Sequence, residues 1–304
     1  MDESSLLPKD IKPTVARAIA EDVGDGDVTA ALVTDDATAT AYVIAKEPCV
    51  VCGKPWFNEV FAQLDPRVKV QWDVMEGGAA RAEQRICVVS GPSRSLLTGE
   101  RTALNFLQLL TGTATMTRKF MDRLRGTTVK IVDTRKTLPG LRAAQKYAVR
   151  LGGGTNHRFG LYDAILIKEN HIAAAGSLAK AIELARGLHP KLQLMAEAEN
   201  LDEVKAGLDG KVDVLLLDDF PTHLLSKAVA MARDYRKFNK AQSLLEASGG
   251  VTLQNVRDIA DTGVDRISVG SLTKNVQSVD LSMRFVNAAA TTTPAAPRPA
   301  APAR

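Results

Sequence analysis

Residues 129–142 read VKIVDTRKTLPGLR, and residues 164–171 read AILIKENH. Each segment begins with an apolar run that is typical of a buried β-strand, and charged residues follow directly. A solvent-exposed charged segment would not need such apolar runs beside it. Because binding and catalytic residues gather where rigid strands give way to loops, we expect these charges to form a site at the strand ends.

A regular alternation of strands and helices continues from these segments through the C-terminal half of the chain, which indicates parallel strands covered by helices. Polar residues or glycines follow the predicted strands. Barrel enzymes collect such groups on one face, whereas an open doubly wound sheet binds its ligand at one switch point. Six strands fall short of the eight in a complete barrel, so we predict an incomplete α/β barrel. The strands are expected at residues 129–132, 164–167, 192–195, 212–217, 244–247 and 266–269, and the helices at 141–150, 176–188, 201–208, 222–236 and 252–261.

The N-terminal part of the chain has a different pattern. Residues 38–89 contain short β-rich runs and one helix near residues 56–64, which predicts an α+β domain with an antiparallel sheet. Further helices are expected at residues 8–22 and, with a break near Thr111–Gly112, at residues 96–124. We divide the chain into an N-terminal domain (1–112) that a C-terminal helix (275–290) rejoins, a barrel domain (113–274), and a disordered tail rich in proline and alanine (291–304).

The composition leads us to expect a cytoplasmic globular protein. The chain has 304 residues, 45% of them apolar, and a net charge of only +4, so general attraction to nucleic acid is not expected. The first five residues include two acids and no apolar run follows, unlike a secretory signal. No run approaches the roughly 20 apolar residues of a membrane span. Three cysteines are too few for a disulfide framework, which fits a reducing compartment.

Two short motifs have both a structural and a functional interpretation. Cys49 and Cys52 have the spacing of redox or zinc sites, but there is no second pair, and the valines between them suggest a strand. The acidic loop at residues 23–29 could hold a metal ion, although an acidic turn that caps a following helix is more common. We favour the structural interpretation of both motifs.

Five basic residues should project into one mouth of the barrel. Such a cluster repels itself unless a ligand brings several negative charges. The planar fork of arginine also matches the paired oxygens of carboxylates and phosphates. We therefore expect a polyanionic ligand. The residues are Arg135, Lys136, His157, Arg158 and Lys168.

Glycines follow the last two predicted strands, in Ser248-Gly249-Gly250 and at Gly270. Barrel enzymes commonly cradle a phosphate at this place with backbone N–H groups, and glycine lets the backbone approach closely. The placement of these residues therefore predicts a phosphate site at the C-terminal ends of the strands.

Two acids, Glu197 and Asp218, follow the middle strands. They suit ribose hydroxyls, a Mg²⁺ ion carried by a polyphosphate, or a developing positive charge. Salt bridges to Lys136 or Lys168 explain them equally well. Residues 214–219, VLLLDD, also resemble the phosphoribosyl diphosphate motif of orotate-type phosphoribosyltransferases, but the sequence FPTH follows instead of a Gly/Thr-rich phosphate loop. That interpretation therefore fails.

The motifs together resemble the quinolinate phosphoribosyltransferase family, also called nicotinate-nucleotide pyrophosphorylase (carboxylating). The resemblance implies an N-terminal α/β sandwich, a C-terminal incomplete α/β barrel and a homodimer. It also implies a Mg²⁺-dependent reaction of NAD biosynthesis, in which quinolinate and phosphoribosyl diphosphate give nicotinate mononucleotide, diphosphate and CO₂. The matching segments are residues 21–29, 100–102, 133–142, 146–148, 152–154, 156–158, 167–171, 248–250 and 268–270, with Glu197 and Asp218.

The resemblance further implies roles for individual residues. Arg101 would reach the site from the neighbouring subunit, although the sequence alone favours an ion pair with Glu100 or Asp122. Mg²⁺ would be held mainly by the substrate diphosphate, with Glu197 and Asp218 as candidate ligands. The implied catalytic residues are Lys136, Lys168, Glu197 and Asp218; the quinolinate ligands are Arg101, Arg135, His157, Arg158 and Lys168; the phosphoribosyl ligands are Lys136, Glu197, Asp218, Ser248, Gly249, Gly250 and Gly270.

Two residues depart from the family pattern. Asp219 stands where the family more often has Asn, and Ser271 where it more often has Ala; neither removes an implied contact. The competing functions are a phosphoribosyltransferase for nicotinate, which has one carboxylate, and a non-catalytic anion or RNA binder. The surplus of cations favours a dicarboxylate, and the 5% aromatic content offers little stacking for bases.

Overall fold

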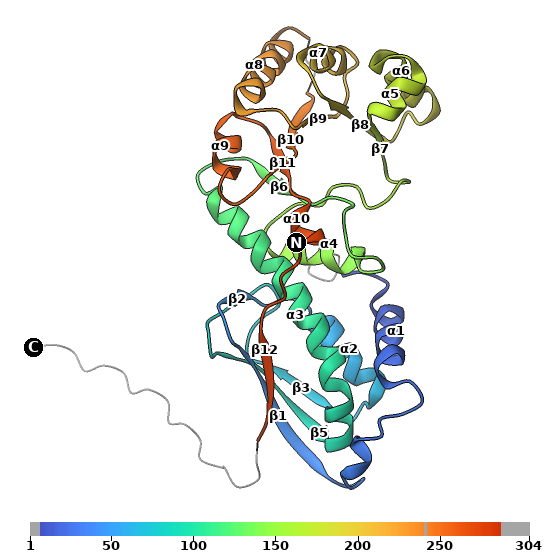
Figure 1. Cartoon of the computed structure of the whole chain (residues 1–304), viewed down its shortest axis with the longest axis vertical. Coiled ribbons are helices and arrows are strands. Elements are labelled where there is room, and N and C mark those ends of the chain that lie inside the picture. Colours follow the sequence, from blue (N-terminus) through green and yellow to red (C-terminus); the bar gives the residue numbers. More distant parts are fainter. Residues whose placement is uncertain (1–6, 240–241, 287–304) are drawn as a thin grey trace, which may run out of the picture.

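One long helix, α3 (Ser93–Arg123), connects the two halves of the molecule (Figure 1). The computed structural model describes residues 7–239 and 242–286, and the predicted tail (291–304) lies outside them. The sequence predicted a break near Thr111–Gly112, but α3 continues through both residues. A Cβ at position 112 would lie 2.2 Å from the carbonyl oxygen of Gln277. This glycine therefore permits a close approach of two chain segments and does not end a helix.

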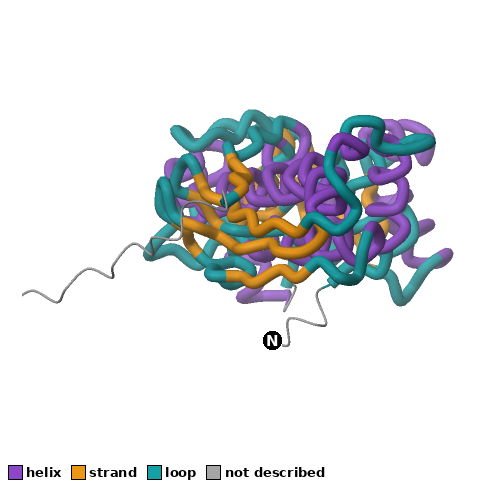
Figure 2. The backbone as a smooth tube through the Cα atoms, turned by 90° about the horizontal axis from the view of Figure 1, so that it is seen from below, coloured by secondary structure: helices purple, strands orange, loops and turns teal. Residues whose placement is uncertain are grey.

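The N-terminal domain is an antiparallel sheet with the strand order β12-β1-β5-β3, and helices cover one of its faces (Figures 1 and 2). Trp56, Phe57 and Leu104 belong to the core of this domain. The arrangement confirms the predicted α/β sandwich. Its elements are α1 (Ile11–Val23), the 3-10 helix η2 (Ala30–Leu32), β1 (Thr38–Ala45), β2 (Cys49–Val50), α2 (Lys54–Leu64), β3 (Lys69–Trp72), β4 (Ala79–Ala80) and β5 (Arg85–Pro92), with β2 and β4 as a separate pair.

The C-terminal segment rejoins this domain as a strand and not as the predicted helix at 275–290. Strand β12 (Leu281–Phe285) pairs antiparallel with β1, where Leu281 faces Ala45 and Phe285 faces Ala41. Leu281 and Met283 are buried while the residues between and after them are more exposed, and this period of two belongs to a strand. Residues 287–290 of the predicted helix lie outside the described ranges.

The barrel domain contains the six predicted strands in one parallel sheet, with the order β6-β11-β10-β9-β8-β7. Helices cover its outer face, and Ala164, Met195, Val214 and Leu216 form a small apolar cluster. The edge strands β6 and β7 do not pair with each other, so the barrel is incomplete as predicted. The elements are β6 (Lys130–Val132), α4 (Arg142–Leu151), β7 (Ala164–Ile167), α5 (Glu169–Ala175), α6 (Leu178–Leu188), β8 (Gln193–Ala198), α7 (Leu201–Asp209), β9 (Val214–Asp218), α8 (Thr222–Asn239), β10 (Leu244–Ser248), α9 (Val256–Asp261), β11 (Arg266–Ser268) and α10 (Ser271–Lys274).

The segment at residues 155–158 spans the opening between the two edge strands. Thr155 forms a parallel bridge with Val132 of β6. Three residues later, Nη1 of Arg158 donates a hydrogen bond of 3.1 Å to the carbonyl oxygen of Ala164 in β7. The segment therefore places His157 and Arg158 beside the C-terminal end of β6, where the first predicted cations lie.

Candidate active site

A cavity of about 370 Å³ at the C-terminal ends of the barrel strands contains most of the predicted site residues. A volume of this order is typical of a small-molecule site. The residues come from the ends of five strands and from the segment that spans the barrel opening, so the predicted convergence is confirmed. The predicted residues in this cavity are Arg135, Lys136, His157, Arg158, Lys168, Glu197, Asp218 and Ser248.

A second cavity, of about 470 Å³, adjoins the first and shares Lys136 and Ser248 with it. It is lined by Gly249, Gly250 and Gly270, as predicted for a phosphate site. Gly249 has φ +97°, and a Cβ there would lie 1.9 Å from Oδ1 of Asp219, so this position requires glycine.

The second cavity also contains residues that the sequence did not single out. Lys274 lies one helical turn after Gly270, and Thr134 precedes the first predicted cation. The spacing of Lys274 from the predicted Gly270 could have indicated it. Ser271, which departs from the family pattern, lines this cavity too.

His157 is a neutral hydrogen-bond donor and does not add a charge to the site. Its Nδ1 accepts the backbone N–H of Arg158 at 2.8 Å, so the ring proton is on Nε2. Burial, with the charges of Arg266, Lys146 and Arg158, lowers the pKa of His157 to about 3. The expectation of a fifth cation is therefore wrong, because the residue is buried among positive charges.

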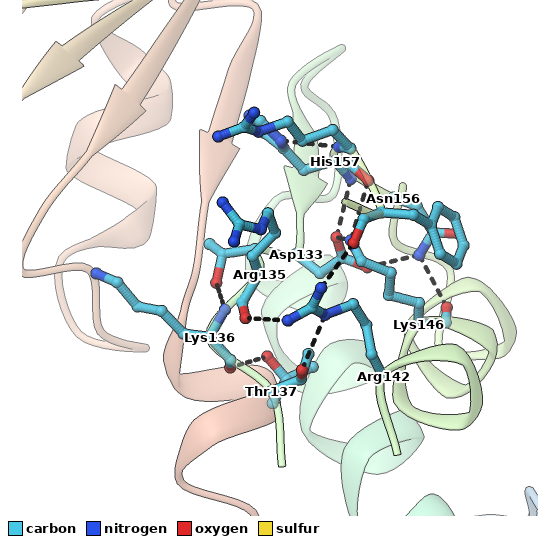
Figure 3. Close-up of polar contacts among 12 residues, drawn as sticks. Asp133, Arg135, Lys136, Thr137, Arg142, Lys146, Asn156 and His157 are labelled. Atoms are coloured by element: carbon cyan, nitrogen blue, oxygen red, sulfur yellow. Dashed lines mark hydrogen bonds and ion pairs between the residues drawn. The ribbon is translucent and has the colours of Figure 1, made fainter. Parts of the chain in front are cut away.

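The backbone around His157 is fixed by a buried polar network (Figure 3). Asp133 and Lys146 are fully buried and form an ion pair. Oδ1 of Asp133 accepts the backbone N–H of His157 at 2.8 Å, and Nζ of Lys146 donates to the carbonyl oxygen of His157 at 2.9 Å. Nδ2 of Asn156 donates to Asp133 and to the carbonyl oxygen of Lys146. These residues support the site without lining it.

The loop that carries Arg135 and Lys136 is fixed in a similar way. Arg142 donates hydrogen bonds to the carbonyl oxygen of Arg135 (3.3 Å) and to Oγ1 of Thr137 (3.2 Å), as Figure 3 shows. Oγ1 of Thr273 donates to the carbonyl oxygen of Lys136 at 2.8 Å. The two cations therefore extend from an ordered backbone.

The remaining charges are unevenly paired. Lys168 forms an ion pair with Glu197, which realises the salt-bridge interpretation of that acid, whereas Asp218 makes no ion pair within residues 7–239 and 242–286. Burial and the charge of Arg135 lower the pKa of Arg158. This repulsion between neighbouring cations indicates that a bound anion would stabilise the site.

Arg101 lies apart from both cavities. It is exposed on α3, and Met116, which lines the second cavity, comes 15 residues later, about 22 Å along a helix. Asp122 pairs with Arg125, and Arg101 makes no ion pair with any residue that the structure describes. The geometry therefore does not bring Arg101 to the site of its own chain.

The cysteine pair, Cys49 and Cys52, and the acidic loop at residues 23–29 both have structural roles. Cys49 and Cys52 are buried free thiols, and burial raises the pKa of Cys49 to about 11. Oδ1 of Asp27 accepts the backbone N–H groups of Thr29 and Ala30 at 3.0 and 2.9 Å, which caps the turn that follows. Within the described ranges, no helix is long and apolar enough to cross a membrane.

Comparison with known proteins finds the same architecture in one family. The family model for the quinolinate phosphoribosyl transferase C-terminal domain matches residues 113–284, and that for the N-terminal domain matches residues 27–111. The chain is 41% identical over 278 residues to the nicotinate-nucleotide pyrophosphorylase [carboxylating] of Mycobacterium leprae, covering 90% of this chain and 96% of that protein. It is 40% identical over 277 residues to a probable enzyme of the same name from Synechocystis, with 91% and 92% covered. The structure of the nicotinate-nucleotide pyrophosphorylase from Francisella tularensis superimposes with a TM-score of 0.87 at 43% identity, covering 92% of this chain and 98% of that one. The chain belongs to the quinolinate phosphoribosyltransferase family.

Proposed function

We propose that this protein transfers the phosphoribosyl group of phosphoribosyl diphosphate to quinolinate, with release of diphosphate and CO₂. The observation that carries the proposal is the direct contact between two cavities of different chemistry. One contains Arg135, Arg158 and Lys168, and the other is lined by serines and glycines together with Lys274. A dicarboxylate and a phosphoribosyl group bound in them would meet at the shared wall.

The residues of this chain can perform each step of the transfer. The arginines, Lys168 and the Nε2–H of His157 hold the two carboxylates, so that the ring nitrogen faces the ribose carbon. Lys136 stabilises the departing diphosphate, and Glu197 or Asp218 stabilises the oxocarbenium-like charge on the ribose. The pyridinium nitrogen formed by the transfer then accepts the electrons of the C2 carboxylate bond as CO₂ leaves, and a proton restores the ring.

Mg²⁺ fits the chemistry of this site. Glu197 and Asp218 line the same cavity as the cations and offer the hard oxygen ligands that Mg²⁺ prefers. Because no three His, Cys, Asp or Glu side chains in the described part of the chain converge as metal ligands, phosphate oxygens would supply most of the ligands. When bound, the ion neutralises charge on the diphosphate leaving group.

A homodimer would complete the site with Arg101 from the partner. The position of Arg101, exposed and distant from its own cavities, supports this arrangement. Arg101→Ala subunits mixed with Lys168→Ala subunits should recover part of the activity, because some mixed dimers contain one intact site. If the mixture stays inactive, Arg101 does not act across an interface.

The decisive assay measures release of labelled CO₂ from quinolinate. The release should depend on both phosphoribosyl diphosphate and Mg²⁺. Nicotinate should be a poorer substrate by roughly 10⁴ to 10⁵, because it leaves cations of the cavity without a carboxylate partner. Comparable turnover of nicotinate would contradict the choice of quinolinate.

A non-catalytic anion or RNA binder is not favoured, because the basic residues converge inside one pocket. Tight, salt-sensitive RNA binding without transfer activity would support it. We also place the enzyme in the cytoplasm, since Cys49, Cys52 and Cys87 are buried thiols without disulfides.

A further inference from the structure

One buried glutamine connects the two cavities from behind. Gln145 is on α4, is fully buried, and lines neither cavity. Its Oε1 accepts the backbone N–H of Leu138 at 2.8 Å, and its Nε2 donates to the carbonyl oxygen of Thr273 at 2.8 Å. Leu138 comes two residues after Lys136, whereas Thr273 is on α10, beside the second cavity. The side chain therefore joins a segment of the cation-rich loop to a segment of the phosphate site.

A third hydrogen bond closes this connection into a ring. Oγ1 of Thr273 donates to the carbonyl oxygen of Lys136 at 2.8 Å, and Thr273 is fully buried as well. The backbone at Lys136 and Leu138 is thus tied to α10 by three hydrogen bonds. Because Lys136 lines both cavities, the ring lies at the border between them. We call the side chains of Gln145 and Thr273 the clasp.

The helix that carries Gln145 is anchored in both domains. Ala148 belongs to the core of the N-terminal domain, and Val149 belongs to the core of the barrel domain. The amide can adopt only one orientation, because after a flip its NH₂ group would face the N–H of Leu138 and its oxygen would face the carbonyl of Thr273. The clasp therefore holds the loop and α10 against a fixed support.

The clasp also satisfies backbone groups that are turned away from solvent, and that role alone would affect only stability. Its location indicates more than that. It spans the border at which the two proposed substrates must meet, and it connects the segments that carry Lys136 and Gly270. A change in the spacing of these segments would change the distance between the reacting groups.

We propose that Gln145 and Thr273 are positioning residues for the transfer step. They fix the loop at residues 133–138 relative to α10, and so fix one bound substrate relative to the other. The proposal rests on the proposed function for its reaction and adds two residues that line neither cavity. A misplacement of about 1 Å can slow a reaction between bound groups about 100-fold. Loss of the clasp should therefore slow the transfer without weakening the binding of either substrate.

The main test compares two buried threonines. Thr273→Val keeps the shape of the side chain and removes its hydrogen bond to Lys136. Thr111→Val is the matched control, because Thr111 is also fully buried and its Oγ1 bonds to the backbone of Cys52, in another segment. Thr273→Ser keeps the hydroxyl and serves as the rescue. The rate of CO₂ release is measured in a single turnover with both substrates saturating, the Kd of each substrate by calorimetry, and folding by thermal unfolding.

Thr273→Val should lower the single-turnover rate about ten- to a hundred-fold and leave both Kd values unchanged. Thr273→Ser should retain most of the rate. Thr111→Val should be as active as the wild type, although it also loses stability. A normal rate in Thr273→Val, an equal loss of rate in Thr111→Val, or a loss that weaker binding of one substrate accounts for would overturn the proposal.

Gln145→Met removes the other two hydrogen bonds of the clasp at nearly constant volume. It should lower the rate at least as much as Thr273→Val does. The double variant should lose less than the product of the two single losses, because both changes break one clasp. Losses that simply multiply would refute a shared clasp. If Gln145→Met does not fold, Gln145→Glu, which still accepts the N–H of Leu138, takes its place, with the same expectation for the double variant.

Hydrogen exchange at Leu138 separates this proposal from the proposed function. Its N–H is bonded to Gln145, so it should exchange faster in Gln145→Met, whereas the N–H of Leu244, which bonds to the carbonyl of Asp213, should not change. Unchanged exchange at Leu138 would show that Gln145 does not hold the loop, whatever the protein catalyses. A wild type that releases no CO₂ would instead contradict the proposed function, and the exchange rates would still decide whether the clasp holds the loop.

Discussion

The two halves of the site are held in place by different physical means. In the half that we propose for quinolinate, which contains Arg135, Arg158 and Lys168, the backbone around the site is fixed by buried polar partners, above all Asp133 and Lys146. In the half that we propose for the phosphoribosyl group, which is lined by Gly249, Gly250 and Gly270, the shape of the backbone depends on the absence of a side chain at Gly249. We therefore expect the first half to be disrupted when a buried polar partner is removed. We expect the second half to be disrupted when atoms are added to its glycines.

Removing the buried carboxylate of Asp133 should cause the largest loss of stability among these variants. Asp133→Ala leaves the charge of Lys146 buried and unpaired and removes the acceptor of the His157 N–H. We expect the free energy of unfolding, measured by urea denaturation, to fall by about 3–5 kcal/mol.

The matched control breaks an exposed ion pair of the same domain. Asp261→Ala removes the partner of Arg257 on α9 and should cost less than about 1 kcal/mol. If the two variants lost equal stability, the buried network would not be what holds the quinolinate half.

Adding one carbon to the second half should affect the other substrate. Gly249→Ala places a Cβ against Oδ1 of Asp219 at a φ of +97°, so the loop must shift. We expect a loss of about 1–3 kcal/mol in binding of phosphoribosyl diphosphate, with unchanged quinolinate affinity, by calorimetry. Gly250→Ala, where the added Cβ meets nothing within 4 Å, should show a smaller loss. A matching loss for quinolinate would mean that the halves are not separable.

The pH dependence of stability should show whether the imidazole of His157 is neutral in the folded protein. The pKa of His157 falls from 6.5 to about 3 on folding, so below pH 6.5 the unfolded chain takes up a proton that the folded chain excludes. The free energy of unfolding is therefore not reduced by His157 above pH 6.5. Between pH 6.5 and pH 3 it falls by about 1.4 kcal/mol for each pH unit. Denaturation of the wild type and of His157→Phe between pH 4 and 7 should reveal the difference in slope. Parallel curves would show that His157 titrates normally.

The smallest expected effect concerns the ion pair that joins the halves. Glu197→Gln releases Lys168 from its partner, and a freed cation should bind a carboxylate more tightly. We expect the Kd of quinolinate, measured without the second substrate, to fall about two- to five-fold, while turnover drops because the ribose loses a carboxylate. Weaker binding of quinolinate would instead show that Glu197 orients Lys168.

Features set by local sequence were predictable. The six barrel strands and the polar group after each follow from apolar runs and from what comes next in the chain, and Lys168 and Asp218 lie at the strand ends where they were expected. Features set by distant contacts were not. Gly112 looked like the end of a helix because Gln277, which passes beside it, is far away in the sequence. The strand β12 looked helical until its partner β1 was known.

The sequence by itself determined which chemical groups the protein has and the face of the barrel on which they gather. Only the tertiary structure decided their state: His157 is neutral, and Lys168 is paired with Glu197. The physical reason is that strand position is encoded by neighbours along the chain, whereas charge and pairing depend on burial and on the groups nearby in space. Those groups come from strands and loops that are brought together only when the barrel forms.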